Sequence, residues 1–307
     1  MNAKRKKTIV GVLAVVIGLP VAFIAVAVAW FRMEGKTNGA IVTSGERRKY
    51  LLYVPKTYDR SKPTPLLISM HAAALRPAAE MEISRWNDLA DEHGFLVVYP
   101  SGSEVPRVWP MGPRSLGRDV GFISDLIDKL EAEYNIDPTR IYADGISNGG
   151  GMAFALSCRL SDRIAAVGAV AAAQTLPWNE CGDPKPVPTV AFHGTADPFA
   201  PYQGGKSRDP FNQVMFPAIP DWTARVARRN QCKGDPIDTR ISAGVRRLAY
   251  TNCADNADVI LYTVEGGGHT WPGGKPLPEW IVGRTTRDIN ASRVMWEFFV
   301  QHPRGPK

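Results

Sequence analysis

A glycine-flanked serine is the first feature of this sequence that suggests chemistry. Residues 145–149 read G-I-S-N-G, a G-x-S-x-G pentapeptide with Ser147 at its centre. A strand-like run, 140–144, precedes it and a helix-like run, 150–156, follows it, which is the setting of a nucleophile elbow. The flanking glycines let backbones approach closely, so that the serine projects at the carboxyl edge of a sheet. We therefore predict that Ser147 is a nucleophile for acyl transfer.

A serine hydroxyl needs a general base near neutral pH, and histidine is the usual one. The chain has five: His71, His93, His193, His269 and His302. His93 ends a helical run, His302 lies in the C-terminal tail, and His193 closes a strand well before the last one. His269 lies in a glycine-rich loop, 266–274, directly after the late strand-like run 259–264. Because the nucleophile-elbow fold orders its catalytic groups as serine, acid and histidine, we predict His269 as the base.

The acid should lie between these two residues, on a loop that follows a strand. Asp197 belongs to H-G-T-A-D-P, residues 193–198, directly after the apolar run 187–193. Its carboxylate would fix the imidazole tautomer and stabilise the imidazolium that forms during attack. Asp183 and Asp221 are alternatives, although neither follows a strand-like run so directly.

A tetrahedral intermediate also needs two backbone donors for its oxyanion. We predict the N–H of Asn148, which follows the nucleophile, and the N–H of Ala73, in the loop 71–74 after the strand-like run 66–70. His71 would organise that loop. Four side chains are candidates for the substrate pocket: His71, Trp109, Tyr202 and Trp271.

Strand-like and helix-like runs alternate along the chain, which predicts an α/β fold with a mostly parallel sheet and helices on both faces. The expected strands are 50–54, 66–71, 95–99, 140–144, 164–170, 187–193 and 259–264. The expected helices are 86–93, 120–134, a segment after Ser147, 221–229 and 291–302. No insertion is long enough to form a large lid domain.

The composition suits one compact domain, which we place at residues 45–305 behind a polar linker, 32–44. Apolar residues make up 44% of the chain and charged residues 22%, as in globular proteins. The formal net charge is +7, but residues 4–7 supply four of the basic groups. The remaining basic residues are scattered and do not alternate with aromatics, which argues against nucleic-acid binding.

The N-terminal residues 1–31 carry an apolar segment with basic residues before it. Residues 8–31 are 24 residues without a charge, and such a helix spans about 36 Å, more than the ~30 Å hydrocarbon core of a bilayer. We favour a retained membrane anchor with the C-terminal domain exported to the outer side of the cytoplasmic membrane. The small residues 27–29 leave a cleaved signal segment and a secreted domain as the alternative.

Four cysteines are present, an even number that in an exported protein indicates disulfides. They are Cys158, Cys181, Cys232 and Cys253. They allow three pairings, and proximity favours Cys158 with Cys181 and Cys232 with Cys253. No C-x-x-C or nearby histidine supports a metal site.

Five short runs resemble the secreted polyhydroxybutyrate depolymerase and feruloyl esterase family. These are F-L-V-V-Y-P at 95–100, D-V-G-F-I at 119–123, G-I-S-N-G-G at 145–150, H-G-T-A-D at 193–197 and E-G-G-G-H-T-W-P-G at 265–273. The resemblance runs in order from 48 to 303. It implies an α/β-hydrolase fold, carboxylic ester hydrolysis without a metal or other cofactor, the triad Ser147, Asp197 and His269, and the pairing of Cys232 with Cys253.

Two positions depart from the family pattern. Ala72 stands where members commonly carry glycine in the oxyanion loop, and Arg118 replaces the first aspartate of a D-D-V-G-F-I run. An alanine fits at residue 72 only with a negative φ. The family label covers short-chain, aryl (feruloyl-type) and hydroxyalkanoate esters, small or polymeric. An acyltransferase of the same fold and an inactive tethered binding protein are the competing interpretations.

Overall fold

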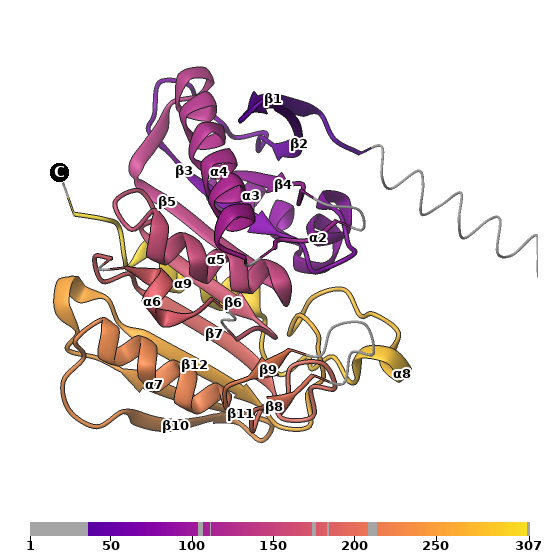
Figure 1. Ribbon diagram of the computed structural model, residues 1–307, viewed down its shortest axis with the longest axis vertical. Coiled ribbons are helices and arrows are strands. Elements are labelled where there is room, and N and C mark those ends of the chain that lie inside the picture. Colours follow the sequence, from indigo (N-terminus) through magenta and orange to yellow (C-terminus); the bar gives the residue numbers. More distant parts are fainter. Residues whose placement is uncertain are drawn as a thin grey trace, which may run out of the picture.

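A ten-stranded sheet runs through the computed structural model, which describes residues 36–103, 107–110, 112–173, 176–182, 184–207 and 214–305 (Figure 1). Across the sheet the strands are β1 (Gly39–Thr43), β2 (Glu46–Tyr53), β4 (Leu96–Pro100), β3 (Thr64–Met70), β5 (Ile136–Ile146), β6 (Ala166–Val170), β7 (Thr189–Gly194), β12 (Val259–Val264), β11 (Val245–Tyr250) and β10 (Ile237–Ser242). The six from β4 to β12 are parallel, and antiparallel strands close both edges. The predicted mostly parallel sheet is confirmed.

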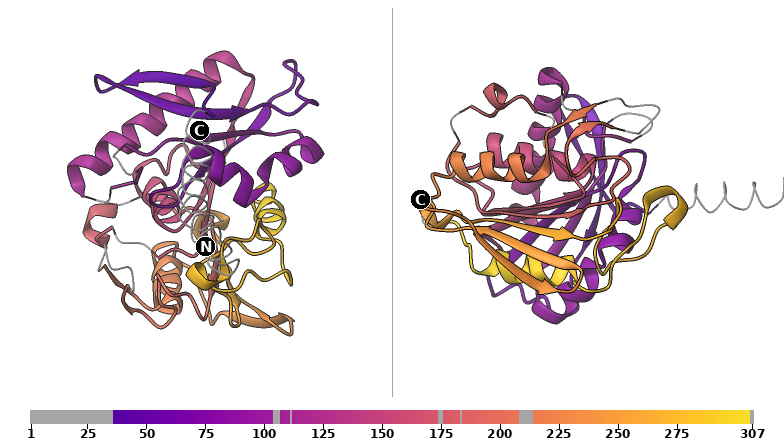
Figure 2. Two further views of the ribbon diagram at one scale, coloured as in Figure 1. Left: turned by 90° about the vertical axis from the view of Figure 1, so that its right-hand side faces the viewer. Right: turned by 90° about the horizontal axis from the view of Figure 1, so that it is seen from below.

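Helices cover both faces of this sheet, as the right view of Figure 2 shows from below. One face carries α4 (Pro113–Glu133), α5 (Asn148–Arg159) and α7 (Ile219–Arg229). The other carries α2 (Pro77–Ser84), α3 (Trp86–His93) and α9 (Ala291–Val300). Because both faces are covered, the central strands are apolar throughout, and every residue of β3, β6 and β12 is buried.

Aromatic stacking fixes α9 against the sheet. The ring of Phe95, just before β4, stacks on Trp296 with ring centroids 3.9 Å apart, and Tyr142 of β5 stacks on Phe299 at 4.9 Å. Such aromatic pairs stabilise the fold beyond what the burial of their apolar surface contributes. Asn290 caps the helix because its side chain accepts a hydrogen bond from the N–H of Arg293 at 3.0 Å.

Several elements were not expected from the sequence. Residues 39–43 of the predicted linker 32–44 form β1, so the folded domain begins inside that linker. The hairpin of β10 and β11 and the helix α2 were also missed. Short elements complete the described chain: α6 (Trp178–Cys181), α8 (Glu279–Val282), a 3₁₀ turn (Ala254–Asn256), β8 (Gly205–Lys206) and β9 (Met215–Phe216).

The predicted anchor, 8–31, lies outside the described residues. Among the helices that are described, none is long and apolar enough to cross a membrane. No large lid domain is inserted among the described elements.

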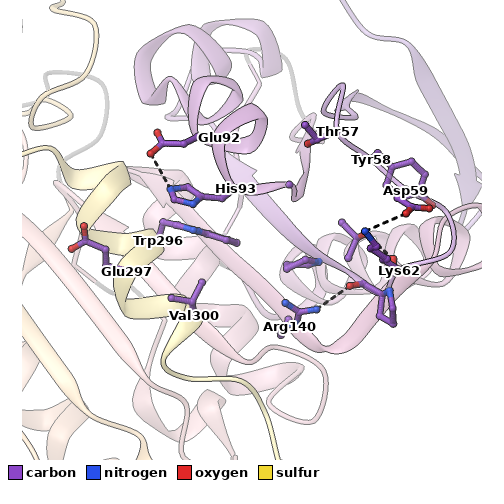
Figure 3. A pocket seen from close by; sticks show the side chains of 14 residues that line it. Thr57, Tyr58, Asp59, Lys62, Glu92, His93, Arg140, Trp296, Glu297 and Val300 are labelled. Atoms are coloured by element: carbon purple, nitrogen blue, oxygen red, sulfur yellow. Dashed lines mark hydrogen bonds and ion pairs between the residues drawn. The ribbon is translucent and has the colours of Figure 1, made fainter.

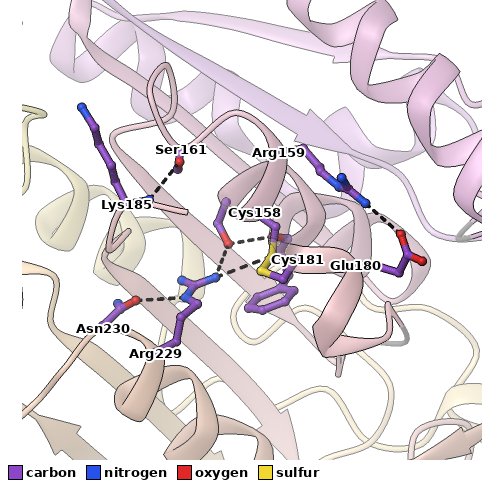
Figure 4. Close-up of a disulfide and its surroundings, with 10 residues drawn as sticks. Cys158, Arg159, Ser161, Glu180, Cys181, Lys185, Arg229 and Asn230 are labelled. Carbon is purple, nitrogen blue, oxygen red and sulfur yellow. Dashed lines mark hydrogen bonds and ion pairs between the residues drawn. A yellow bond between two sulfur atoms is a disulfide. The ribbon is translucent and has the colours of Figure 1, made fainter. Parts of the chain in front are cut away.

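Two disulfides are present, and their pairing is the one that proximity favours. Cys158 of α5 is bonded to Cys181 of α6, and Cys232 is bonded to Cys253. Figure 4 shows the first bond beside Arg229, whose Nη1 donates to Ser157 Oγ at 2.9 Å and approaches Cys158 Sγ at 3.7 Å. Burial lowers the pKa of the Arg229 guanidinium to about 10. The disulfide between Cys158 and Cys181 ties α6 to α5, the helix that begins directly after Ser147.

Candidate active site

The three residues proposed for catalysis follow three parallel strands that end at one edge of the sheet. Ser147 comes directly after β5, Asp197 is three residues beyond the end of β7, and His269 is five residues beyond the end of β12. The strand order β5-β6-β7-β12 places these ends in a row. Since carboxyl ends of parallel strands share an edge, the fold gathers the three residues there.

Ser147 occupies a strained turn between β5 and α5. Its backbone has φ 56° and ψ −123°, a conformation that L-residues rarely adopt. The Ser147 N–H donates to the carbonyl of Val170 at 2.8 Å, which holds the turn. A Cβ on Gly145 would lie 2.5 Å from the Met70 carbonyl oxygen, and one on Gly149 would lie 2.0 Å from it. Both glycines of the pentapeptide are therefore required by close backbone approach, as the sequence predicts.

Asp197 and His269 are joined by a hydrogen bond. His269 Nδ1 lies 2.8 Å from Asp197 Oδ2, and Asp197 Oδ1 accepts from the N–H groups of Phe199 and Ala200, each at 2.8 Å. Burial alone would raise the pKa of Asp197, but His269, His193 and the backbone donors outweigh it and lower that pKa below its ordinary value. Asp197 is therefore a carboxylate near neutral pH and a suitable acceptor for an imidazole N–H.

Backbone contacts fix the loop that carries His269. The His269 N–H donates to the Val282 carbonyl at 2.6 Å, and the Gly268 N–H donates to that of Arg284 at 2.9 Å. A Cβ on Gly194 would lie 2.1 Å from the Gly267 carbonyl oxygen. Only a glycine at 194 lets the end of β7 approach this loop, which brings Asp197 next to the imidazole.

His193 is a second histidine beside the carboxylate, although its position before the last strand did not indicate a place in the site. Its Nε2 lies 2.8 Å from the Ala200 carbonyl oxygen and 3.4 Å from Asp197 Oδ2. The side chain is 1% exposed, and burial lowers the pKa of its imidazole despite the attraction of Asp197. A neutral His193 therefore supports Asp197 from the strand side. The sequence feature that could have indicated this contact is the position of His193 four residues before Asp197, the predicted acid.

The predicted oxyanion loop is tied to the nucleophile elbow through Trp109. The Asn148 side chain holds the Trp109 backbone from both sides: its Oδ1 accepts from the Trp109 N–H at 2.6 Å and its Nδ2 donates to the Trp109 carbonyl at 2.7 Å. The indole N–H of Trp109 donates to the His71 carbonyl at 3.0 Å. The N–H of Ala74 donates to the Arg107 carbonyl at 2.7 Å. These bonds connect the loop 71–74 to the turn at Ser147.

His71 organises this loop as a neutral side chain. Its Nε2 accepts from the N–H of Gly102 at 3.0 Å, and its Nδ1 lies 2.8 Å from the Ala72 carbonyl oxygen. Burial, together with repulsion from Arg107, lowers the pKa of His71 to about 4. Ala72 is not among the residues with positive φ, whereas Ala74 has φ 61°. The alanine that replaces glycine at 72 is thus tolerated, because the left-handed residue of the loop is a different one.

The four pocket candidates lie in different surroundings. Trp109 and Trp271 are 0% and 1% exposed, so their rings belong to the core and present no surface to a substrate, contrary to the expectation. His71 is equally buried. Tyr202 is half-buried, and its hydroxyl lies 2.8 Å from Thr263 Oγ1. Phe199, for which no sequence motif indicated a role, lies edge-on to the His269 ring at 5.2 Å.

The alternative acids are not found beside His269. Asp221 is exposed in the first turn of α7, and Asp183 lies outside the described residues. Throughout the described chain, no group of three or more His, Cys, Asp and Glu side chains is placed to hold a metal ion.

A groove of about 680 Å³ opens away from these residues, at the amino ends of the strands (Figure 3). Thr64 at the start of β3, His93 at the end of α3 and Val300 at the end of α9 line it. Two ion pairs lie within it, Lys62 with Asp59 at 3.5 Å and His93 with Glu92 at 3.5 Å. The groove is therefore separate from the edge that carries Ser147.

Comparison with known proteins identifies related chains. Residues 48–175, which include Ser147, match the family model described as Esterase PHB depolymerase. The chain is a relative of these esterases. It is 31% identical to Feruloyl esterase B of Piromyces equi over 74% of its length, although it spans only 44% of that protein. It is 26% identical to Feruloyl esterase D of Neurospora crassa over 85% of its length and 86% of that protein.

The fold is shared with a solved esterase. An acetyl xylan esterase from Aspergillus awamori superposes with a TM-score of 0.61 and 14% identity, over 85% of this chain and 98% of that one. This chain therefore has the predicted α/β-hydrolase fold. The predicted family resemblance is confirmed by the match of residues 48–175 to the family model.

Proposed function

We propose that this chain is a serine carboxylic ester hydrolase that works through an acyl-enzyme intermediate. The observation that supports it most is the 2.8 Å hydrogen bond between His269 Nδ1 and Asp197 Oδ2, at the sheet edge where Ser147 occupies its strained turn. A carboxylate that accepts a hydrogen bond from Nδ1 keeps the imidazole proton on that nitrogen. Nε2 is then unprotonated and can act as a base. The esterase relatives support the same reaction class.

In the first half of the proposed reaction, Ser147 Oγ attacks the ester carbonyl while His269 Nε2 takes the hydroxyl proton. Asp197 stabilises the imidazolium that results. The oxyanion is held by the N–H groups of Asn148 and Ala73. Ala73 is exposed, and among the described residues its N–H has no acceptor, so it is available to a ligand.

The intermediate then collapses. His269 Nε2 returns its proton to the leaving alcohol and the acyl group stays on Ser147. Water attacks this ester while His269 Nε2 accepts one of its protons. His269 then returns this proton to Ser147 Oγ as the bond between Ser147 Oγ and the acyl carbon breaks, and the carboxylic acid leaves. No cofactor enters this scheme.

We place the substrates among short-chain, aryl (feruloyl-type) and hydroxyalkanoate esters. The names of the relatives, feruloyl and acetyl xylan esterases, support the small-acyl and aryl classes. The half-buried ring of Phe199 lies edge-on to that of His269. The half-buried ring of Tyr202 lies 6.2 Å from that of His193, which contacts Asp197. Hydrolysis rates for p-nitrophenyl esters, methyl ferulate and hydroxybutyrate oligomers would rank the classes, and product ratios with added glycerol would separate hydrolysis from acyl transfer.

We also propose that residues 8–31 anchor the domain outside the cytoplasmic membrane, with a short linker ahead of β1. The basic residues 4–7 and the uncharged length of the segment support this topology. The two disulfides support an oxidising compartment.

Labelling with a fluorophosphonate tests the nucleophile. The wild-type protein should be labelled and should hydrolyse p-nitrophenyl acetate, whereas Ser147→Ala should do neither, with an unchanged circular dichroism spectrum. Ser44→Ala is a matched control, because Ser44 also has a positive φ of 49° but lies in the turn between β1 and β2. Labelling that persists in Ser147→Ala would refute the assignment.

A further inference from the structure

The short helix α8 exposes two adjacent large apolar side chains. Trp280 is 87% exposed and Ile281 is 43% exposed. Single exposed apolar residues are ordinary in soluble proteins, but a fully presented tryptophan beside an isoleucine forms a compact apolar tip. Val282, the next residue, accepts the backbone hydrogen bond of His269 at 2.6 Å. The apolar tip, Trp280 and Ile281, therefore belongs to the segment that holds the proposed general base.

The chain enters the folded domain on the same side as this tip. Lys36, the first described residue, lies with its Nζ 4.0 Å from Glu82 Oε1 of α2. Glu82 Oε2 also pairs with Lys275, five residues before Trp280. In Figure 1 the start of the described chain and α8 both project from the right-hand side of the domain, and the left view of Figure 2 looks onto that side.

Chain length limits how far this side can lie from the proposed anchor. Five peptide steps separate Phe31, the last residue of the uncharged segment, from Lys36. Even a fully extended chain spans only about 18 Å over five residues. If residues 8–31 span a bilayer, Lys36 must lie within that distance of its surface, so the side of the domain that carries α8 faces the lipid.

The residues at the tip suit a membrane interface. Tryptophan prefers the headgroup region, where its ring is in contact with acyl chains and its N–H stays hydrated. Lys275, which is paired with Glu82, precedes α8, and the exposed Arg284, which follows α8, would favour anionic headgroups. Glu279 is the acidic residue of α8 itself.

We infer that Trp280 and Ile281 insert into the interface of the bilayer that anchors residues 8–31. This inference rests on the proposed anchor, and it adds a defined orientation. Because α8 is bonded to the His269 loop, the carboxyl edge of the sheet then faces the membrane. Ester substrates would reach Ser147 from the lipid surface side rather than from the side of the groove at the opposite edge.

Brominated lipids test this orientation. Full-length protein is reconstituted into vesicles of phosphatidylcholine and phosphatidylglycerol, with or without phosphatidylcholine brominated near the carbonyl end of the acyl chains. The emission of wild type minus that of Trp280→Phe isolates residue 280. We expect this difference spectrum to be shifted to the blue and to lose most of its intensity with brominated lipid. Trp178→Phe is the matched control, since α6 lies on the opposite side of the domain and its difference spectrum should not be quenched (Figure 1).

Flotation of the same vesicles separates the two proposals. A chain that floats with the vesicles but whose residue 280 emits as in water, without quenching, would overturn the docking of α8 and leave the anchor standing. A full-length chain that stays at the bottom of the gradient would overturn both. A chain that floats and is quenched at residue 280 but not at residue 178 supports the inference.

Discussion

Asp144 is a buried carboxyl group that the proposed mechanism does not use, and it should make stability depend on pH. It lies on β5, three residues before Ser147, and is 0% exposed. Its Oδ2 accepts from the indole N–H of Trp86 at 2.7 Å. Its Oδ1 is buried without a hydrogen-bond partner among the described residues. Burial raises the pKa of Asp144 to about 7, although hydrogen bonds from Ser69 and Trp86 act in the opposite direction.

The neighbouring carboxyl group reinforces this effect. Glu80 of α2 is also 0% exposed, and Ser69 Oγ donates to its Oε1 at 3.4 Å. Burial, and then repulsion by Asp144, hold the pKa of Glu80 well above its usual range. Burial and the neighbouring carboxyl group therefore both favour the protonated form of Glu80.

The direction in which pH changes the free energy of unfolding follows from whether the folded or the unfolded chain binds more protons. Asp144 has an ordinary value of 3.8 for its pKa, which applies to the unfolded chain, against about 7 in the fold. Between about pH 4 and pH 7 the folded protein keeps a proton that the unfolded chain has released, so the free energy of unfolding falls as pH rises. At about 1.4 kcal/mol for each pH unit, the loss due to this group reaches up to about 4 kcal/mol and levels off above pH 7.

Asp144→Asn removes this titration while keeping an oxygen that can accept from Trp86. Urea unfolding of wild type and variant, followed by tryptophan fluorescence at several values between about pH 4 and pH 8, measures the difference. The stability of Asp144→Asn relative to wild type should increase steadily up to about pH 7. Asp221→Asn, at an exposed carboxyl group, should follow the wild-type curve. Parallel curves for wild type and Asp144→Asn would refute the reasoning.

Three further changes test the site and its support. Asp197→Asn keeps the side-chain size but favours the wrong imidazole tautomer, so kcat for a p-nitrophenyl ester should fall by up to about four orders of magnitude. Gly149→Ala puts a Cβ 2.0 Å from a backbone oxygen and should sharply lower the midpoint of thermal unfolding, whereas Gly117→Ala, with nothing within 4 Å, should not. Replacing Cys232 and Cys253 by Ser opens a bridge of sequence separation 21 and should cost about 3 kcal/mol in urea titrations. An unchanged urea midpoint would contradict the stabilising role of this disulfide.

Local patterns of the sequence determined much of the fold. The bounds of α3 and β12 agree with the expected helix 86–93 and strand 259–264, because each is an uninterrupted periodic or apolar run between turn residues. The parallel order of strands follows from their alternation with helices. The sequence also predicted the glycine turn around Ser147 and the position of Asp197 after an apolar strand. Both could be predicted because a turn and its flanking elements are contiguous in the chain.

Strands that face solvent were harder to predict. Five of the six residues of β10 are exposed, and β11 carries Arg246 and Arg247, so neither presents the apolar run that marks a buried strand. Their pairing depends on β12, which lies beside them in space. The start of β1 inside the predicted linker has a different cause. Its run G-A-I-V-T is short and mostly half-buried, and it is ordered as a strand by pairing with β2.

Contacts between distant residues were decided only by the tertiary structure. Asn148 and Trp109 are 39 residues apart yet share two hydrogen bonds, and Trp86 reaches Asp144 across 58 residues. The burial of Trp109 and Trp271 in the core, and the approach of His193 to Asp197, likewise depend on which side chains each strand and loop brings together. Sequence periodicity records which face of an element is apolar. It does not record which partner meets that face, because the partner is chosen by packing over the whole domain.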